Sequence, residues 1–168
     1  MDWLQFGAQW LHVLLGITWF GSVLATNFIF IPALMRLPIQ QQQSMGVAYG
    51  EVAGRLLTRA GEGVILLGIL RGTVLGPIKS LDMLTSQYGI TWLVALIAAI
   101  ATYLWGKRVI EPAVKRINSV DPARALLADG SPAPELTAAF ADVKRKSMLE
   151  LLGFLVIFTC MILMRFGL

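Results

Sequence analysis

The chain has 168 residues, of which 57% are hydrophobic and only 14% charged, and its net charge is +4. Its mean hydropathy is +0.71. Soluble domains carry roughly 25% charged residues, so an ordinary water-facing surface is excluded and an integral membrane protein is predicted. The basic excess does not indicate a nucleic-acid partner. Most basic residues fall between the apolar segments, where they indicate the orientation of the chain in the membrane. The single cysteine, Cys160, excludes an internal disulfide.

The first apolar segment runs over residues 3–35 and contains no Lys, Arg, Asp or Glu. A helix needs about 20 residues to cross a bilayer, so this segment is long enough to span. It is also longer than the apolar core of a signal peptide, which is about 7–15 residues. Pro32 lies near its end and is expected to kink the helix, because proline removes a backbone donor.

A second apolar segment covers about residues 56–78, although Arg59, Glu62 and Arg71 interrupt it. It ends at the Gly76-Pro77 turn signal. The polar stretch before it, residues 38–49, is expected to be a loop or a short interfacial helix.

The third segment covers about residues 89–106, and its helical spacing continues to about residue 117. Residues 119–134 resemble a linker, and the fourth segment covers about residues 147–166. The sequence therefore predicts a single all-α membrane domain, an antiparallel bundle of four transmembrane helices.

The basic residues give the orientation. Eleven of the 14 lie between segments one and two or between three and four: Arg36, Arg55, Arg59, Lys107, Arg108, Lys115, Arg116, Arg124, Lys144, Arg145 and Lys146. The other three are Arg71, Lys79 and Arg165. Because basic loops stay in the cytoplasm, both termini are predicted on the outer side. Tryptophan and tyrosine mark membrane interfaces, so an outer aromatic belt is expected from Trp3, Trp10, Tyr88 and Trp92, and Trp105 is expected at the inner boundary.

His12 is the only histidine of the chain and lies inside the first apolar segment. A polar group in the membrane is costly and is often functional. Gly16 and Trp19 follow at four and seven residues, on the same helical face. Arg71 is expected at a similar depth in the second segment. This set suits a haem, with His12 as iron ligand and Arg71 neutralising a propionate.

Gly68, Gly72 and Gly76 repeat every four residues in the second segment, and Gly61 lies two turns earlier. Such a stripe admits a porphyrin plane, but it also suits close packing of another helix. His12 has a structural alternative too, a hydrogen bond to Asn27, Thr18 or a carbonyl.

Other polar residues have similarly ordinary alternatives. The long side chain of Arg71 can place its guanidinium group at the membrane surface. Glu62 and Glu150 can pair with Arg59, Arg145 or Lys146 instead of relaying protons.

Cys160 and Met164 share one face of the fourth segment. Soft sulfur ligands select Cu(I), and His12 could add a third ligand. Methionine is also a common apolar filler, which leaves this copper site as an alternative. The sequence has no nucleotide loop, zinc signature, catalytic triad or pair of catalytic carboxylates, so enzymatic activity and catalytic residues stay open.

The stretch from Trp10 to Gly21, WLHVLLGITWFG, resembles the opening helix of a group of small membrane proteins. The group comprises copper-resistance D-type domains, the membrane domain of some bacterial urate oxidases, and the haem-using membrane protoporphyrinogen oxidases. The resemblance covers about residues 9–21 and implies that His12 ligates haem b in a bacterial inner membrane. In the oxidases a lysine in a later helix is the opposite ligand, but residues 89–106 contain no lysine or histidine.

The function expected from the sequence is therefore a membrane b-type haem protein that takes part in electron transfer or redox sensing. The site residues expected are His12, Gly16, Trp19, Gly68, Arg71 and Gly72. Copper handling and a non-catalytic accessory subunit of a membrane complex are the alternatives. A homodimer or a partner subunit is expected, because the glycine-lined faces invite association.

Overall fold

The computed structural model describes residues 3–121, 127 and 133–167, and this part of the chain contains helices and no strand. The helices form four long rods. The first rod is α1 (Trp3–Ala25), the π-helical turn η1 (Thr26–Phe30) and α2 (Ile31–Leu34); the second is α3 (Ile39–Gly72). The third is α4 (Gln87–Trp105), the π-helical turn η3 (Gly106–Ile110) and α5 (Glu111–Asn118); the fourth is α7 (Pro134–Arg165). A short 3-10 helix, η2 (Leu81–Thr85), precedes α4.

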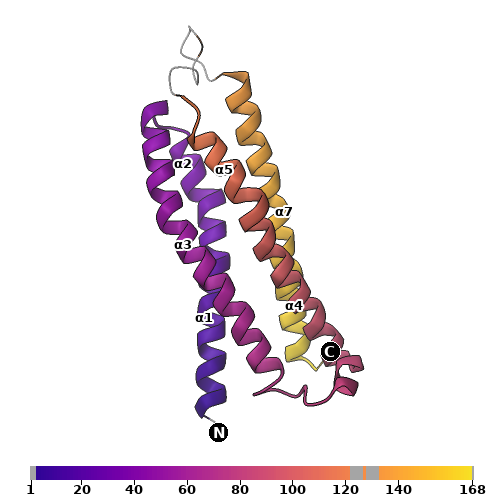
Figure 1. Ribbon diagram of the computed structural model, residues 1–168. Helices are drawn as coiled ribbons and strands as arrows, with labels where there is room; N and C mark the ends of the chain where they lie inside the picture. The colour runs from indigo at the N-terminus through magenta and orange to yellow at the C-terminus, as the bar shows by residue number, and fades with distance from the viewer. Residues whose placement is uncertain (1–2, 122–126, 128–132, 168) are drawn as a thin grey trace.

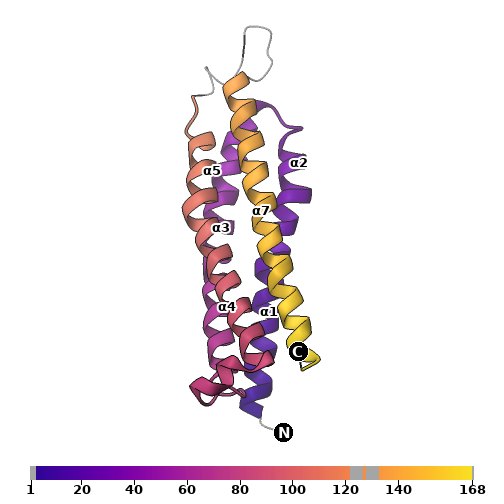
Figure 2. The ribbon, with the colours of Figure 1, turned by 90° about the vertical axis from the view of Figure 1, so that its right-hand side faces the viewer.

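The rods alternate in direction and lie side by side as an elongated antiparallel bundle (Figures 1 and 2). The start of α1 and the end of α7 lie at one end, called here the terminus end. The starts of α3 and α7 and the end of α5 lie at the opposite end, called the linker end. Arg124 and most of the predicted linker fall outside the described residues.

Three rods are long and apolar enough to cross a membrane: Trp3–Leu34, Gln87–Asn118 and Pro134–Arg165. Only 11–22% of the most apolar window of each is buried inside the bundle, so most of these side chains face outward. Outward apolar side chains are what a lipid environment stabilises and water does not. The structure thus agrees with an integral membrane protein.

The second rod differs from the expected segment at both ends. Residues 39–49, expected as a loop or a separate short helix, are the first turns of the continuous α3. Glutamine has good helix propensity, and contacts with other rods hold this part: Tyr49 bonds Thr26, and Gln43 donates to the carbonyl of Val120. At its other end α3 stops at Gly72, six residues before the expected boundary.

Both π-helical turns lie immediately before a proline. Thr26–Phe30 precedes Ile31-Pro32, and Gly106–Ile110 precedes Glu111-Pro112. Proline has no N–H to give to the carbonyl four residues earlier, and its ring collides with that carbonyl. A π turn adds one residue and moves the carbonyl aside, so each rod continues past its proline. The kink expected at Pro32 takes this form.

Contacts between neighbouring rods advance in equal steps. Along α1 and α3 the contacting pairs are His12–Gly68 and Trp19–Gly61, seven residues apart on both helices. Gln5 and Leu75, which lies just after the end of α3, continue the same step. Along α3 and the third rod the contacting pairs are Gly72–Trp92, Gly61–Tyr103 and Gly46–Asn118. Equal steps are the signature of antiparallel rods that stay in register, and they allow depths to be compared between helices.

The main core lies where all four rods meet. It consists of Trp19, Val23, Ala60, Val64, Ala99, Phe154 and Ile157. Trp19 packs edge-on against Phe154, with ring centroids 4.7 Å apart. A second, smaller core at the linker end consists of Ile117, Leu136 and Val143.

Gly61 is predicted to be indispensable to this packing. A Cβ there would lie 2.9 Å from the Tyr103 ring and 3.2 Å from the Trp19 ring. Gly61→Ala should therefore destabilise the protein by about 1–3 kcal/mol, the usual cost of overpacking. Thermal unfolding in detergent measures the effect.

Gly54→Ala is the matched control, one heptad away on the same helix. A Cβ there meets nothing within 4 Å, so alanine's better helix propensity should leave stability unchanged or slightly raised. Equal destabilisation by both changes would contradict the packing described for Gly61.

Candidate functional site

His12 lies inside the bundle, between α1 and α3, with only 8% of its surface exposed. Its Cε1 atom lies 3.3 Å from the position that a Cβ on Gly68 would take. The backbone carbonyl of Val64, one turn from Gly68, lies close to the imidazole. The Nδ1 atom is buried and has no hydrogen-bond partner among the described residues.

The structural alternatives for His12 were a hydrogen bond to Asn27, Thr18 or a carbonyl. A backbone carbonyl, that of Val64, lies close to the imidazole. Thr18 and Asn27, the other partners considered, instead donate to carbonyls of their own helix, Leu14 and Val23, at 2.9 Å. A buried polar atom left unpaired costs about 1–3 kcal/mol, so the free Nδ1 is the unexplained feature of this residue.

Two more unpartnered polar atoms lie at the same interface. Gln9 Oε1 and Arg71 Nε are both buried and lack a hydrogen-bond partner in the described part of the chain. Gln9 lies three residues before His12 on α1, and Arg71 lies three residues after Gly68 on α3. Because the two helices are antiparallel, Gln9 and Arg71 lie at the same level. Arg71 is also close enough to act electrostatically on the imidazole. A cation and two acceptors therefore gather near the terminus end.

Trp92 of α4 packs against α3 next to these residues. Its Nε1 donates to the carbonyl of Gly68 at 3.2 Å, and the same atom lies 2.0 Å from the Cβ position of Gly72. The indole thus fills the space that a side chain at Gly72 would take. We call Gln9, His12, Gly68, Arg71 and Trp92 the α1–α3 seam.

The other expected site residues take different places. Trp19 is 4% exposed and belongs to the main core, packed against Phe154 and Tyr103, and not to the seam. Gly16 lies one turn from His12, and a Cβ there would meet nothing within 4 Å. Of the glycines considered, Gly16 is therefore the one that leaves open space beside His12.

The sequence interpretation missed Gln9 and the packing of Trp92 against α3. Gln9 lies three residues before His12 on one helical face, and this spacing was a usable signal. Trp92 was expected in an outer aromatic belt, which stays a prediction; its half-buried indole N–H donates to a backbone carbonyl of α3. Trp3 and Trp10, by contrast, are 76% and 60% exposed, as belt residues would be.

The residues present fit part of a haem site. His12 offers a buried nitrogen with a free lone pair, and Arg71 offers a guanidinium at a nearby level. The spaces at Gly68 and Gly72 do not fit a porphyrin plane, because the His12 ring and the Trp92 indole occupy them. Open space lies at Gly16, one turn from His12.

The copper alternative finds less support. Cys160 is buried in the bundle, and Met164, one turn further along α7, is half-buried. In the described part of the chain no group of three or more His, Cys, Asp or Glu side chains could hold a metal ion. A copper site here would have to depend on methionine sulfur.

Neither Glu62 nor Glu150 forms the expected ion pairs in the described part of the chain. Glu62 accepts a hydrogen bond of 2.6 Å from the Tyr103 hydroxyl. Glu150 lies against Gly106, with Oε1 3.0 Å from the Cβ position of that glycine. The ion pairs among the described residues are Lys115–Glu111 and Lys146–Asp142.

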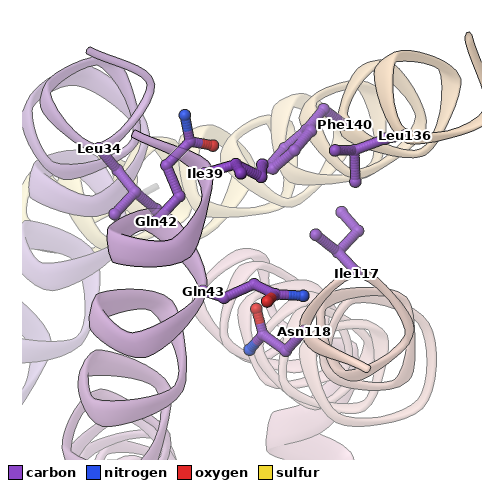
Figure 3. A pocket seen from close by; sticks show the side chains of 8 residues that line it. All are labelled: Leu34, Ile39, Gln42, Gln43, Ile117, Asn118, Leu136 and Phe140. Carbon is purple, nitrogen blue, oxygen red and sulfur yellow. The ribbon is translucent and has the colours of Figure 1, made fainter. Parts of the chain in front are cut away.

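A small cavity lies at the linker end, far from His12. Its volume is about 30 Å³, room for about two water molecules. Figure 3 shows Gln43 of α3 and Asn118 of α5 pointing toward one another on one side of it. The Oε1 atom of Gln42, which also lines it, is buried without a partner in the described part of the chain. The cavity is too small for an organic cofactor.

The indole hydrogen bond of Trp92 is predicted to stabilise the seam. Trp92→Phe keeps an aromatic ring over Gly72 but leaves the Gly68 carbonyl without this donor. The expected loss is about 0.5–1.5 kcal/mol, measured by thermal unfolding in detergent. Trp10→Phe, on the exposed surface of α1, should change the stability little; a Trp92→Phe protein as stable as wild type would show that the bond contributes nothing.

A comparison of this chain with protein-family models, curated proteins and solved structures gives no match in any of the three. The resemblance of Trp10–Gly21 to a haem-binding helix therefore stays a prediction. The features that bear on its function are the α1–α3 seam and the placement of the rods.

Proposed function

We propose that the protein crosses the membrane four times, with the linker end in the cytoplasm and both termini outside. The support is the position of α3, which lies between α1 and α4 and contacts both along most of its length. If the neighbouring rods cross, α3 crosses with them. Its Glu62 lies on the outside of the bundle and accepts a hydrogen bond from Tyr103 of α4, which lowers the cost of a charge at that depth.

The lengths of the rods agree with this placement. Each has 32–34 residues, about 50 Å at 1.5 Å per residue. A hydrocarbon core of about 30 Å leaves some 20 Å of each rod outside. Most basic residues lie on the linker end, so that end extends into the cytoplasm.

Cysteine labelling tests the crossing of α3. In a Cys160→Ser background, Ser80→Cys should react with an impermeant maleimide in intact cells, because it lies beyond the terminus end of α3. Ser44→Cys, near the start of α3, and Ser119→Cys, after α5, should react only after permeabilisation. Equal reactivity of Ser44→Cys and Ser80→Cys in intact cells would exclude a spanning α3.

We further propose that the protein binds a b-type haem through His12. The observation that carries this proposal is the buried Nδ1 of His12, which has no hydrogen-bond partner in the described part of the chain. Histidines that ligate metals usually have a carbonyl or carboxylate near the ring, which orients it, and the Val64 carbonyl lies close to this imidazole.

Arg71 would neutralise one propionate, and its unpartnered Nε is available for a charge-assisted hydrogen bond. Gly16 leaves space beside the ligand. A bound haem would supply one-electron redox chemistry. Electron transfer or redox sensing within the membrane is therefore the function we propose.

Spectroscopy of the purified protein tests this directly. Protein from haem-replete cells should show a Soret band that sharpens with dithionite, and His12→Ala should lose it. Gln9→Ala, one turn away in the same seam, is the control and should keep the band.

Loss of the band in both variants would mean that the seam as a whole, and not ligation by His12, is what matters. A wild-type spectrum without a Soret band, unchanged by added haemin, would overturn the proposal and favour an accessory subunit.

A further inference from the structure

Glu62, a carboxylate of the membrane-spanning part of α3, lies on the outside of the bundle. Its side chain is exposed, and its Oε1 atom accepts a hydrogen bond of 2.6 Å from the hydroxyl of Tyr103. The Tyr103 ring lies against α3 at Gly61, where a Cβ would be 2.9 Å from it. The exposed ammonium of Lys107, in η3, lies 5.7 Å from the centre of the same ring. An acid and a base thus lie beside one tyrosine where α3 meets the third rod.

Exposed apolar side chains continue this surface toward the terminus end. Leu66 and Ile69 of α3 and Ile100 of α4 are exposed, and helical spacing places them on the faces of Glu62 and Tyr103. In Figure 2 α3 and α4 lie to the left of α1 and α2. We call this surface the α3–α4 face; its residues are Glu62, Leu66, Ile69, Ile100, Tyr103 and Lys107.

Glu62 has no cation to pair with in the described part of its own chain, where the ion pairs are Lys115–Glu111 and Lys146–Asp142. A carboxylate can accept about four hydrogen bonds, and the Tyr103 hydroxyl supplies one. Carboxylates inside a membrane almost always face protein or water and not lipid. A second protein surface is therefore needed to cover Glu62.

The glycine faces that were expected to invite association are already occupied. Rings of the same chain lie against Gly61, Gly68 and Gly72. A contact between copies therefore has to use another face.

The register of the rods gives the depth of the two charges. Gly61 is level with Tyr103, so Glu62 is level with residue 102, and Lys107 lies five residues nearer the linker end. That offset is about 7 Å along the rods. The Lys107 side chain reaches back to the Tyr103 ring, which brings its ammonium toward the level of Glu62. The acid belongs to α3 and the base to the third rod, so they lie on opposite sides of the line where these rods meet.

A second copy of the chain would insert with the same orientation, which allows a two-fold axis along the membrane normal. A half-turn about an axis through the α3–α4 face exchanges its two sides and keeps every depth. We propose that the protein forms a symmetric dimer through the α3–α4 face, in which Glu62 of each copy pairs with Lys107 of the other. The exposed apolar residues of the face pack around these two ion pairs. This inference rests on the proposed four-span placement but not on haem binding.

Energy transfer between labelled copies of the full-length protein in liposomes measures the dimer. In a Cys160→Ser background, Ser80→Cys carries a donor dye in one preparation and an acceptor dye in the other. Wild-type protein should show transfer that falls on dilution with lipid. Glu62→Lys or Lys107→Glu should weaken dimerisation about 100-fold, because a hydrogen bond to a charged group contributes about tenfold and the dimer contains this contact twice.

The double reversal Glu62→Lys/Lys107→Glu recreates the pair in the opposite sense and should restore most of the wild-type affinity. Glu62→Gln keeps an acceptor for Tyr103 but loses the charge, so it should weaken the dimer about tenfold. The matched control is Lys144→Glu, the same charge change at an exposed lysine of α7, outside the α3–α4 face. It should leave the dimer affinity unchanged. Circular dichroism confirms that each variant is helical.

Wild-type protein without energy transfer at any lipid ratio would overturn the proposal and assign the face to a different membrane protein. Equal weakening by Lys107→Glu and Lys144→Glu, or a double reversal no better than either single one, would overturn it as well. The maleimide experiment tests the crossing of α3 whether or not copies associate. A monomer with the expected labelling pattern would therefore contradict this inference alone.

Discussion

The bundle depends on rings of other helices lying directly against glycines of α3. Trp19 and Tyr103 meet Gly61, His12 meets Gly68, and Trp92 fills the space at Gly72. Inside a membrane there is no hydrophobic difference between lipid and side chain, so close packing and hydrogen bonds have to hold helices together. Glycine permits both, because it lets a ring reach the backbone and, at Gly68, lets an indole bond a carbonyl. These contacts fix the rotation of the first and third rods around the second.

The same contacts explain why the seam is polar. A helix turned so that His12 faces Gly68 also turns Gln9 inward, and α3 in turn brings Arg71 to that level. Their unpartnered atoms are a cost to folding that packing elsewhere has to offset. Proteins retain such costs mainly where a ligand, an ion or a proton compensates for them, which is why we place the proposed haem site at the seam.

Much of the fold was predictable, because long uncharged runs such as residues 3–35 leave few alternatives to a helix in a membrane. Residues 38–49 were misread, because hydropathy identifies only lipid-facing segments. It does not identify a polar stretch of helix that is stabilised by contacts with neighbouring rods. The site was predictable only in part. His12 and Arg71 were recognisable as polar residues in apolar surroundings, but the glycine stripe was ambiguous, since spacing alone does not say whether Trp92 or a cofactor occupies it.

The π turns have a consequence for how this sequence can change over time. Each accommodates one residue beyond the α-helical count by widening a single turn, so the helix after it keeps the same face toward its neighbours. Lineages that lost Pro32 or Pro112 would have no reason to keep the extra residue, and deleting it would restore an α-helical turn without changing the face that α2 or α5 presents. Each proline and the extra residue before it are thus expected to be gained or lost together, as a single-residue gap when related chains are aligned.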